Sequence, residues 1–174
     1  MVYKGNYSNN ERNGEGCDYD EDGNKRYSGN YVNGFREGSG HLFDKNHILR
    51  FSGHFLSGII QGNGIAYDEF GKKIYEGEFL NNKFHGFGSM YHKNNKLMTN
   101  TVFYQGNFVN GKIEGEGKEF SGDEGFLGCC LYDGNWVQGC RHNFGVSYDH
   151  NGNKVYEGEW KFGKREGFGV VYSS

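Results

Sequence analysis

The chain has 174 residues, with 31 glycines, no proline and 34% apolar residues, and its mean hydropathy is −0.85. Low hydropathy alone would suit a disordered chain, but aromatic residues make up 17% of this sequence and disordered chains are poor in them. The net charge of −3 argues against a nucleic-acid-binding protein, which usually carries a strong basic excess. The composition therefore predicts an ordered protein with a thin interior and no nucleic-acid partner.

The lack of a secretory or membrane-spanning segment and the cysteine usage favour a cytoplasmic location. No apolar run approaches the ~20 residues that span a bilayer, and the N-terminus lacks the apolar segment of a secretory signal. The four cysteines, Cys17, Cys129, Cys130 and Cys140, are too few and too unevenly spaced for a disulfide framework. We therefore expect a reducing environment and free thiols.

The dominant pattern is a repeat unit of 24 residues that occurs seven times. Each unit opens with an aromatic residue, a glycine two residues later and a second aromatic two after that, as in Tyr27, Gly29 and Tyr31. Another glycine stands 13 residues after the opening aromatic, and a third aromatic 16 residues after it. We predict one array over residues 1–174, with units at 3–26, 27–50, 51–74, 75–103, 104–131, 132–155 and 156–174.

The spacing within each unit predicts β-strands. Residues at alternate positions share one face of a strand, and a helix would lose roughly 1 kcal/mol for every glycine relative to alanine. The seventh position of the unit is glycine in five units and asparagine in the other two, Asn10 and Asn82. Asparagine is the commonest non-glycine residue with positive φ, so this position is predicted to be a turn. Each unit is then one β-hairpin.

The same spacing suggests how the strands pair. If the opening aromatic lies opposite the third aromatic, all three aromatic columns fall on one face of the sheet. Successive hairpins would then form an all-β, elongated, twisted, single-layer antiparallel meander of about seven hairpins, because long sheets twist. The aromatic face would line a groove.

Two units depart from this regular pattern in their connections. The residues between hairpins are more numerous at 92–103 and 121–131, and both connections lie on the same edge of the predicted sheet. Insertions on one edge of a repeat array often mark a binding edge. Length variation in a surface loop is the alternative, because such loops tolerate insertion.

Two segments carry a family resemblance most clearly. They are Tyr75-Glu76-Gly77-Glu78-Phe79 with His85-Gly86-Phe87-Gly88, and Tyr156-Glu157-Gly158-Glu159-Trp160 with Glu166-Gly167-Phe168-Gly169. Both resemble the MORN repeat (membrane occupation and recognition nexus), and the resemblance extends over residues 3 to 172. The departures are Asn10, Asn82 and Asn143 at glycine positions, the two longer connections, and phenylalanine or tyrosine where tryptophan is more usual.

The resemblance implies a scaffold in a cytoskeletal or membrane-associated assembly. Similar arrays bind a partner helix in a groove, self-associate or bind phosphoinositides, and some are accessory domains of larger enzymes such as lipid kinases. We therefore expect a non-catalytic protein-interaction scaffold without a cofactor. The alternatives are a membrane-surface adaptor for anionic phospholipid and an accessory repeat domain of a larger enzyme.

The predicted partner site is the second aromatic column, because a one-layer sheet leaves rings to be covered by another molecule. Mutual stacking that hides the rings is the alternative. The partner is expected to be a protein segment such as an amphipathic helix. The predicted groove residues are Tyr7, Tyr31, Phe55, Phe79, Phe108, Trp136 and Trp160.

Basic residues near the predicted turns form a second candidate surface, one that would meet anionic lipid headgroups. Acidic neighbours such as Glu37, Glu114 and Glu166 reduce its charge. The predicted rim residues are Arg36, Lys83, Lys112, Arg141, Lys164 and Arg165. The terminal strands offer a third surface, because open strand edges favour a homo-oligomer.

Catalytic and metal sites are not predicted. The Gly-x-Gly pairs recur between strands, whereas a dinucleotide-binding loop leads from a strand into a helix. Cys129, Cys130, Cys140 and His142 match no standard zinc spacing. The repeat pattern itself accounts for nearly every residue of catalytic type.

Overall fold

The structure is a computed structural model that describes residues 2–92 and 100–173. The chain divides into two compact units, Met1–Lys83 and Phe84–Ser174. The described residues form β-strands, turns and loops, with no helix. The predicted all-β class is confirmed.

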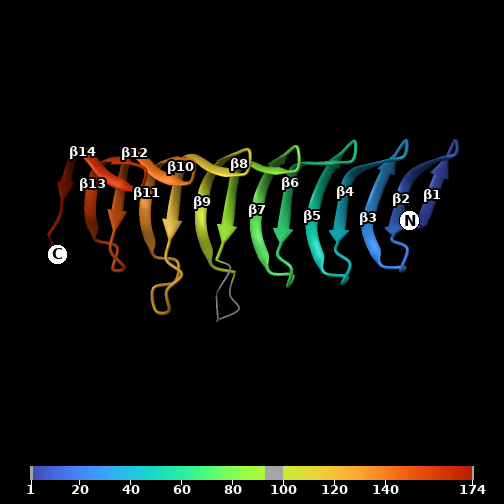
Figure 1. The fold of residues 1–174 in the computed structure, drawn as a ribbon, viewed down its shortest axis with the longest axis horizontal. Helices are drawn as coiled ribbons and strands as arrows, with labels where there is room; N and C mark the ends of the chain where they lie inside the picture. Colours follow the sequence, from blue (N-terminus) through green and yellow to red (C-terminus); the bar gives the residue numbers. More distant parts are fainter. Residues whose placement is uncertain (1, 93–99, 174) are drawn as a thin grey trace. The chain divides into compact units, whose positions relative to one another are not determined.

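The first unit is an antiparallel meander in which every strand pairs with the next one along the chain. Hairpin turns lie along one edge of it and the connections between hairpins along the other (Figure 1). Its strands are β1 (Val2–Ser8), β2 (Glu11–Tyr19), β3 (Lys25–Val32), β4 (Phe35–Phe43), β5 (Leu49–Leu56), β6 (Ile59–Tyr67) and β7 (Lys73–Leu80).

The second unit is built in the same way. Its first strand, β8, begins at Lys83, which is the last residue of the first unit. Its consecutive strands also pair antiparallel. They are β8 (Lys83–Tyr91), β9 (Val102–Val109), β10 (Lys112–Phe120), β11 (Cys130–Val137), β12 (Cys140–Tyr148), β13 (Lys154–Lys161) and β14 (Lys164–Val171). The predicted meander of β-hairpins is confirmed in each unit.

The hairpin turns have the backbone that their sequence predicts. In the turn between β3 and β4, Asn33 has φ of 47° and Gly34 has φ of 82°. Asn10 and Asn82, which replace glycine at the same position, both have φ of 64°. Two consecutive residues with positive φ make the type I′ turn that fits the twist of paired strands.

The predicted strand register is wrong by one residue. Tyr27 pairs with Leu42 rather than with Phe43, and Gly29 pairs with Gly40. Because neighbouring residues of a strand point to opposite faces, the third aromatic column lies on the other face from the first two. A bulge at Gly38, whose φ is 66°, lies between the pairs Tyr31–Arg36 and Gly29–Gly40 and sets this register.

The paired glycines form a seat for the opening aromatic ring. The Tyr27 ring lies over Gly29 and Gly40, and its hydroxyl donates to the Asn30 carbonyl at 3.1 Å. A Cβ atom on Gly29 would stand 2.6 Å from the Gly40 Cα, closer than such atoms approach. Glycine is needed on both strands because a side chain on either would displace the ring.

The core of each unit is a single file of aromatic rings. Tyr27 meets Tyr31 of its own hairpin and Phe55 of the next, with ring centroids 5.2 Å apart and the planes nearly perpendicular in both pairs. In the second unit Tyr132 meets Trp136 and Trp160 in the same way. Such edge-to-face pairs contribute about 0.5–1.5 kcal/mol beyond burial, so the file stabilises the junctions between hairpins within each unit.

Backbone hydrogen bonds also join each turn to the hairpin before it. The Gly34 N–H donates to the Arg12 carbonyl at 3.0 Å, and the Gly58 N–H donates to the Arg36 carbonyl at 2.9 Å. In the second unit the Gly163 N–H donates to the Arg141 carbonyl at 2.9 Å. The hairpins of a unit are therefore held together at their turns as well as along their strands.

A side chain reinforces several of these junctions. Glu37 accepts a hydrogen bond from the Ser57 N–H at 2.8 Å, and Glu114 accepts one from the Gln138 N–H at 2.9 Å. His142 occupies the same place in its hairpin and accepts from the Phe162 N–H through Nδ1 at 3.2 Å. Glu37 and Glu114, which the sequence analysis treated as acidic neighbours of the rim cations, thus order the next turn, as His142 does.

The two longer connections differ in what the structure describes. Residues 93–99 of the first lie outside the described residues. In the second, Phe126 stacks on His150 at 4.5 Å, and Ser121 is buried. This connection is therefore folded onto its neighbour, and its role as a binding edge stays a prediction.

Replacement of a seat glycine should destabilise the fold. We expect Gly29→Ala to lower the free energy of unfolding by about 2–3 kcal/mol, because the added methyl group collides with Gly40 and the Tyr27 ring. Gly34→Asn is the control, since its Cβ would have open space and asparagine accepts positive φ. Urea titration followed by circular dichroism measures both, and equal stability of the two variants would contradict the seat.

Alkaline pH should unfold the protein through its buried tyrosines. Burial raises the pKa of Tyr27 and of Tyr132 from 10.0 to about 12. A raised folded-state pKa gives stability that is complete below the unfolded-state pKa and is lost as the pH rises through the folded value. We expect unfolding to be steepest between pH 10 and about 12. Tyrosinate absorbance and circular dichroism followed together test this, and full ionisation without loss of strand signal would contradict it.

Candidate interaction surfaces

The predicted groove residues are almost all buried. Six of the seven have at most 6% of their surface exposed and form the aromatic file, as the structure places Tyr31, Phe55, Phe79, Phe108, Trp136 and Trp160. The two indole N–H groups donate to backbone carbonyls, Trp136 to Gly117 at 3.0 Å and Trp160 to Gly145 at 3.1 Å. Mutual stacking therefore hides these rings, as the alternative interpretation of the sequence expected. Contact between them and a partner stays a prediction.

Tyr7 is the exception among the predicted groove residues. The residue is 62% exposed, and its ring packs edge-to-face on Tyr3 with the centroids 5.2 Å apart. The equivalent Tyr31 lies between two rings, Tyr3 and Tyr27. Tyr7 lies on β1, the first strand, so its other side is not covered by a preceding hairpin in the described residues.

The predicted rim cations fall into two groups. The guanidinium groups of Arg36 and Arg141 lie 4.5 Å and 4.7 Å from the ring centroids of Tyr27 and Tyr132, on the aromatic face. Arg165 lies 4.8 Å from the Tyr156 ring centroid but stays exposed. The prediction that arginine and lysine form one rim is therefore wrong for Arg36 and Arg141. Lys83, Lys112 and Lys164 are exposed at the starts of their strands beside the turns.

A buried carboxylate explains where Arg36 points. Asp18 is 2% exposed and pairs with Arg12 at 2.8 Å and Arg36 at 3.0 Å, so it joins two successive hairpins. In the second unit Glu119 pairs with Arg141 at 2.7 Å. Buried charges need such partners because desolvation of an unpaired ion is costly. The signal in the sequence was an acidic residue directly before the third aromatic, as Asp18 is before Tyr19. The mistaken register placed the third aromatic on the face of the other rings, and so the acidic residue on the opposite face.

An exposed apolar stripe along the turn edge of the first unit was missed by the sequence reasoning. Val32 pairs with Phe35, and Leu56 pairs with Ile59, on either side of two successive turns. The stripe consists of five residues that are 37–60% exposed, Val32, Phe35, Leu56, Ile59 and Leu80. The signal in the sequence was apolar residues next to turn glycines, where other hairpins have Ser8, Glu11, Lys161 and Lys164.

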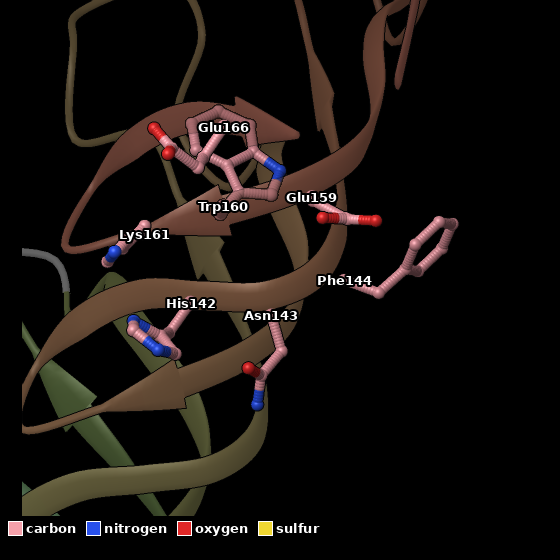
Figure 2. Close-up of a pocket in the computed structure, with 7 residues that line it drawn as sticks. All are labelled: His142, Asn143, Phe144, Glu159, Trp160, Lys161 and Glu166. Atoms are coloured by element: carbon pink, nitrogen blue, oxygen red, sulfur yellow. The ribbon is translucent and has the colours of Figure 1, made fainter. Parts of the chain in front are cut away.

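The second unit has a hollow of about 360 Å³ between β12, β13 and β14. Its lining residues are His142, Asn143, Phe144, Glu159, Trp160, Lys161 and Glu166 (Figure 2). His142 is engaged in capping the next turn, and Phe144 points away from His142 and Lys161 (Figure 2). The hollow therefore offers few groups that converge on a ligand.

Residues 2–92 and 100–173 contain neither a metal-binding cluster nor a membrane-spanning helix. Within these residues no group of three or more His, Cys, Asp or Glu side chains is placed to hold a metal ion. The four cysteines are free and half-buried. The same part of the chain contains no helix long and apolar enough to cross a membrane.

Comparison with protein families identifies the repeat. The family model of the MORN repeat matches at residues 3–25, 27–47, 75–96, 104–125, 132–154 and 156–174. No curated protein matches the chain. The predicted third repeat is not matched, yet its strands β5 and β6 have the same glycine pair, Gly53 and Gly64, and the same ring contacts. MORN repeats are generally non-catalytic and occur in repeat proteins involved in membrane or protein interactions.

Loss of the buried carboxylate should destabilise the first unit. We expect Asp18→Ala to cost roughly 3 kcal/mol of unfolding free energy, because two part-buried arginines lose their partner. Asp133→Ala is the control, since its pair with Lys118 at 2.9 Å is exposed and contributes less than about 1 kcal/mol. Urea titration compares them, and a cost for Asp18→Ala no larger than that of the control would contradict the structural role.

Proposed function

The chain belongs to the MORN-repeat family, and we propose that it is a non-catalytic scaffold that binds an amphipathic helix of a protein partner on the apolar stripe. The exposed stripe on the first unit carries the proposal. The assembly is expected to be cytoskeletal or membrane-associated and cytoplasmic.

The stripe has the character of an interaction surface. Its five apolar side chains are neighbours along one edge, and contiguous exposed apolar patches usually mark binding sites. The file of buried rings behind it fixes the hairpins relative to one another within the unit. The stripe is therefore presented on a rigid support, which reduces the entropy that binding would cost.

The spacing of the stripe suits a helix. Successive hairpins are two strands apart, or about 9.6 Å at ~4.8 Å per strand. Seven residues of an α-helix rise about 10.5 Å, so an apolar residue recurs at nearly the same interval. A helix lying across β3 to β7 would place one apolar turn against each hairpin, and the polar turn residues Asn33, Ser57 and Asn81 would border it.

A second candidate function is an adaptor for anionic phospholipid, including phosphoinositide. The exposed lysines beside the turns, Lys83, Lys112 and Lys164, favour it. Each cation near an anionic membrane contributes about 1 kcal/mol, and the net charge of −3 opposes adsorption. An accessory role in a larger enzyme is a further alternative, and it uses the same surfaces.

The test uses a fluorescent synthetic peptide with leucine at the a and d positions of three heptads. We expect it to bind the chain, and the double variant Phe35→Ser with Leu56→Ser to weaken binding at least about tenfold, because each buried apolar side chain contributes roughly 1.5–3 kcal/mol. Fluorescence anisotropy measures the affinity, and circular dichroism verifies that the variant is folded.

The matched control is Phe70→Ser. Phe70 is 76% exposed in the same unit but lies in the connection between β6 and β7, at the edge opposite the hairpin turns. Equal affinity of the stripe variant and the Phe70 variant would refute the stripe. Binding to phosphoinositide vesicles that is abolished by salt, without binding to the peptide, would instead favour the lipid adaptor.

A further inference from the structure

Each hairpin within a unit meets the next through one recurring set of contacts. The opening ring of the earlier hairpin packs on the second ring of the later one, as Tyr3 does on Tyr31. The turn of the later hairpin donates a backbone hydrogen bond to the earlier one, as Gly34 does to Arg12. A carboxylate or imidazole of the earlier hairpin accepts from the N–H of the preceding turn residue, as Glu37 does from Ser57.

The last strand, β14, carries the earlier half of this set. The Arg165 carbonyl occupies the position of the Arg12, Arg36 and Arg141 carbonyls, which accept from the following turn. Glu166 occupies the position of Glu37, Glu114 and His142. Tyr156 packs on Trp160 of its own hairpin, and its other side corresponds to the side on which Tyr132 contacts Trp160.

The first strand, β1, and its turn carry the later half. The Asn10 N–H occupies the position of the donors Gly34, Gly58 and Asn82. Tyr7 occupies the position of Tyr31 and Phe55, and it is 62% exposed where they are at most 3% exposed. The β1 hairpin therefore has the turn N–H donor and the ring that would complete the contacts of β14.

In the part of the chain that the structure describes, the backbone of β14 pairs on one side only, with β13. The Tyr172 N–H donates to the Val155 carbonyl, so it points to β13. Alternate residues of an antiparallel strand direct their N–H and C=O groups to opposite sides, so Gly169 and Val171 direct theirs away from β13. Natural sheets often protect such edges with proline, and this chain contains none.

We propose that β14 of one copy of this chain pairs antiparallel with β1 of a second copy, in the register that joins hairpins within each unit. Tyr7 of the second copy would pack edge-to-face on Tyr156 of the first, and its Asn10 N–H would donate to the Arg165 carbonyl. The two surfaces differ, so the contact is heterologous and leads to chains or rings of copies. The apolar stripe takes no part in it.

Two variants block the two edges separately. Tyr7→Asp places a charge where a buried ring must lie, at little cost to the free chain because Tyr7 is mostly exposed. Val171→Pro removes an outward-directed N–H from β14, and Val171 is 65% exposed. The conservative variants Tyr7→Phe and Val171→Thr keep the ring and the N–H and serve as matched controls.

Size-exclusion chromatography with light scattering measures the mass of residues 1–174 across a wide concentration range. We expect the unmodified chain and both controls to exceed the monomer mass of 19.8 kDa as concentration rises. Each blocked variant alone should stay monomeric, with apparent affinity weaker by at least about tenfold. An equal mixture of the two should form a dimer and no larger species, because one supplies a free β14 and the other a free β1.

Three outcomes would overturn the proposal. The first is an unmodified chain that stays monomeric at every concentration. The second is a Tyr7→Asp variant that dimerises alone, which would indicate that β14 pairs with β14. The third is folded blocked variants, verified by circular dichroism, that do not dimerise on mixing. None of these outcomes depends on peptide binding to the stripe, so the two proposals fail separately.

Discussion

The structure depends on a close approach of two backbones beneath a tyrosine or phenylalanine ring. Gly29 and Gly40 face each other directly, and the Tyr27 ring lies across both, with its hydroxyl bonded to the Asn30 carbonyl. Because the ring lies along the sheet instead of standing away from it, it reaches the rings of its own and of the next hairpin. A one-layer sheet can thereby bury its largest side chains without a second layer to cover them.

Much of this could be predicted from the sequence because the determinants are local. Asparagine in place of glycine at positions 10 and 82 revealed the turn conformation, and the alternation of rings and glycines revealed the strands. The strand register could not be predicted from the sequence in the same way. Gly38 looks like any other glycine of the repeat, yet it forms a bulge that shifts the pairing. The Gly29–Gly40 contact fixes which residues face each other.

The error in register spread to the predicted site. The register that was predicted puts the residue before the third aromatic, here Asp18, on the face opposite the rings, and Arg36 was predicted to lie on a rim that meets lipid. In the structure the two residues form an ion pair, and Arg36 covers the Tyr27 ring. The apolar stripe was missed for a different reason. Val32 and Phe35 interrupt no motif, and their significance appears only when pairing places them beside each other and in line with Leu56 and Ile59.

The hydrogen bonds that join each turn to the preceding hairpin determine which insertions and deletions the fold can accept. Gly34 and Gly58 make the same bond to the preceding hairpin, so removal of one complete hairpin leaves its neighbours able to rejoin. An extra residue inside β3 or β4 would instead shift Gly29 out of register with Gly40, the two glycines over which the Tyr27 ring lies. The structure therefore accommodates the duplication or loss of a whole hairpin better than an insertion inside a strand. The connection at residues 121–129 shows that length can vary between hairpins, because Gly117 and Gly134 of the strands beside it still pair.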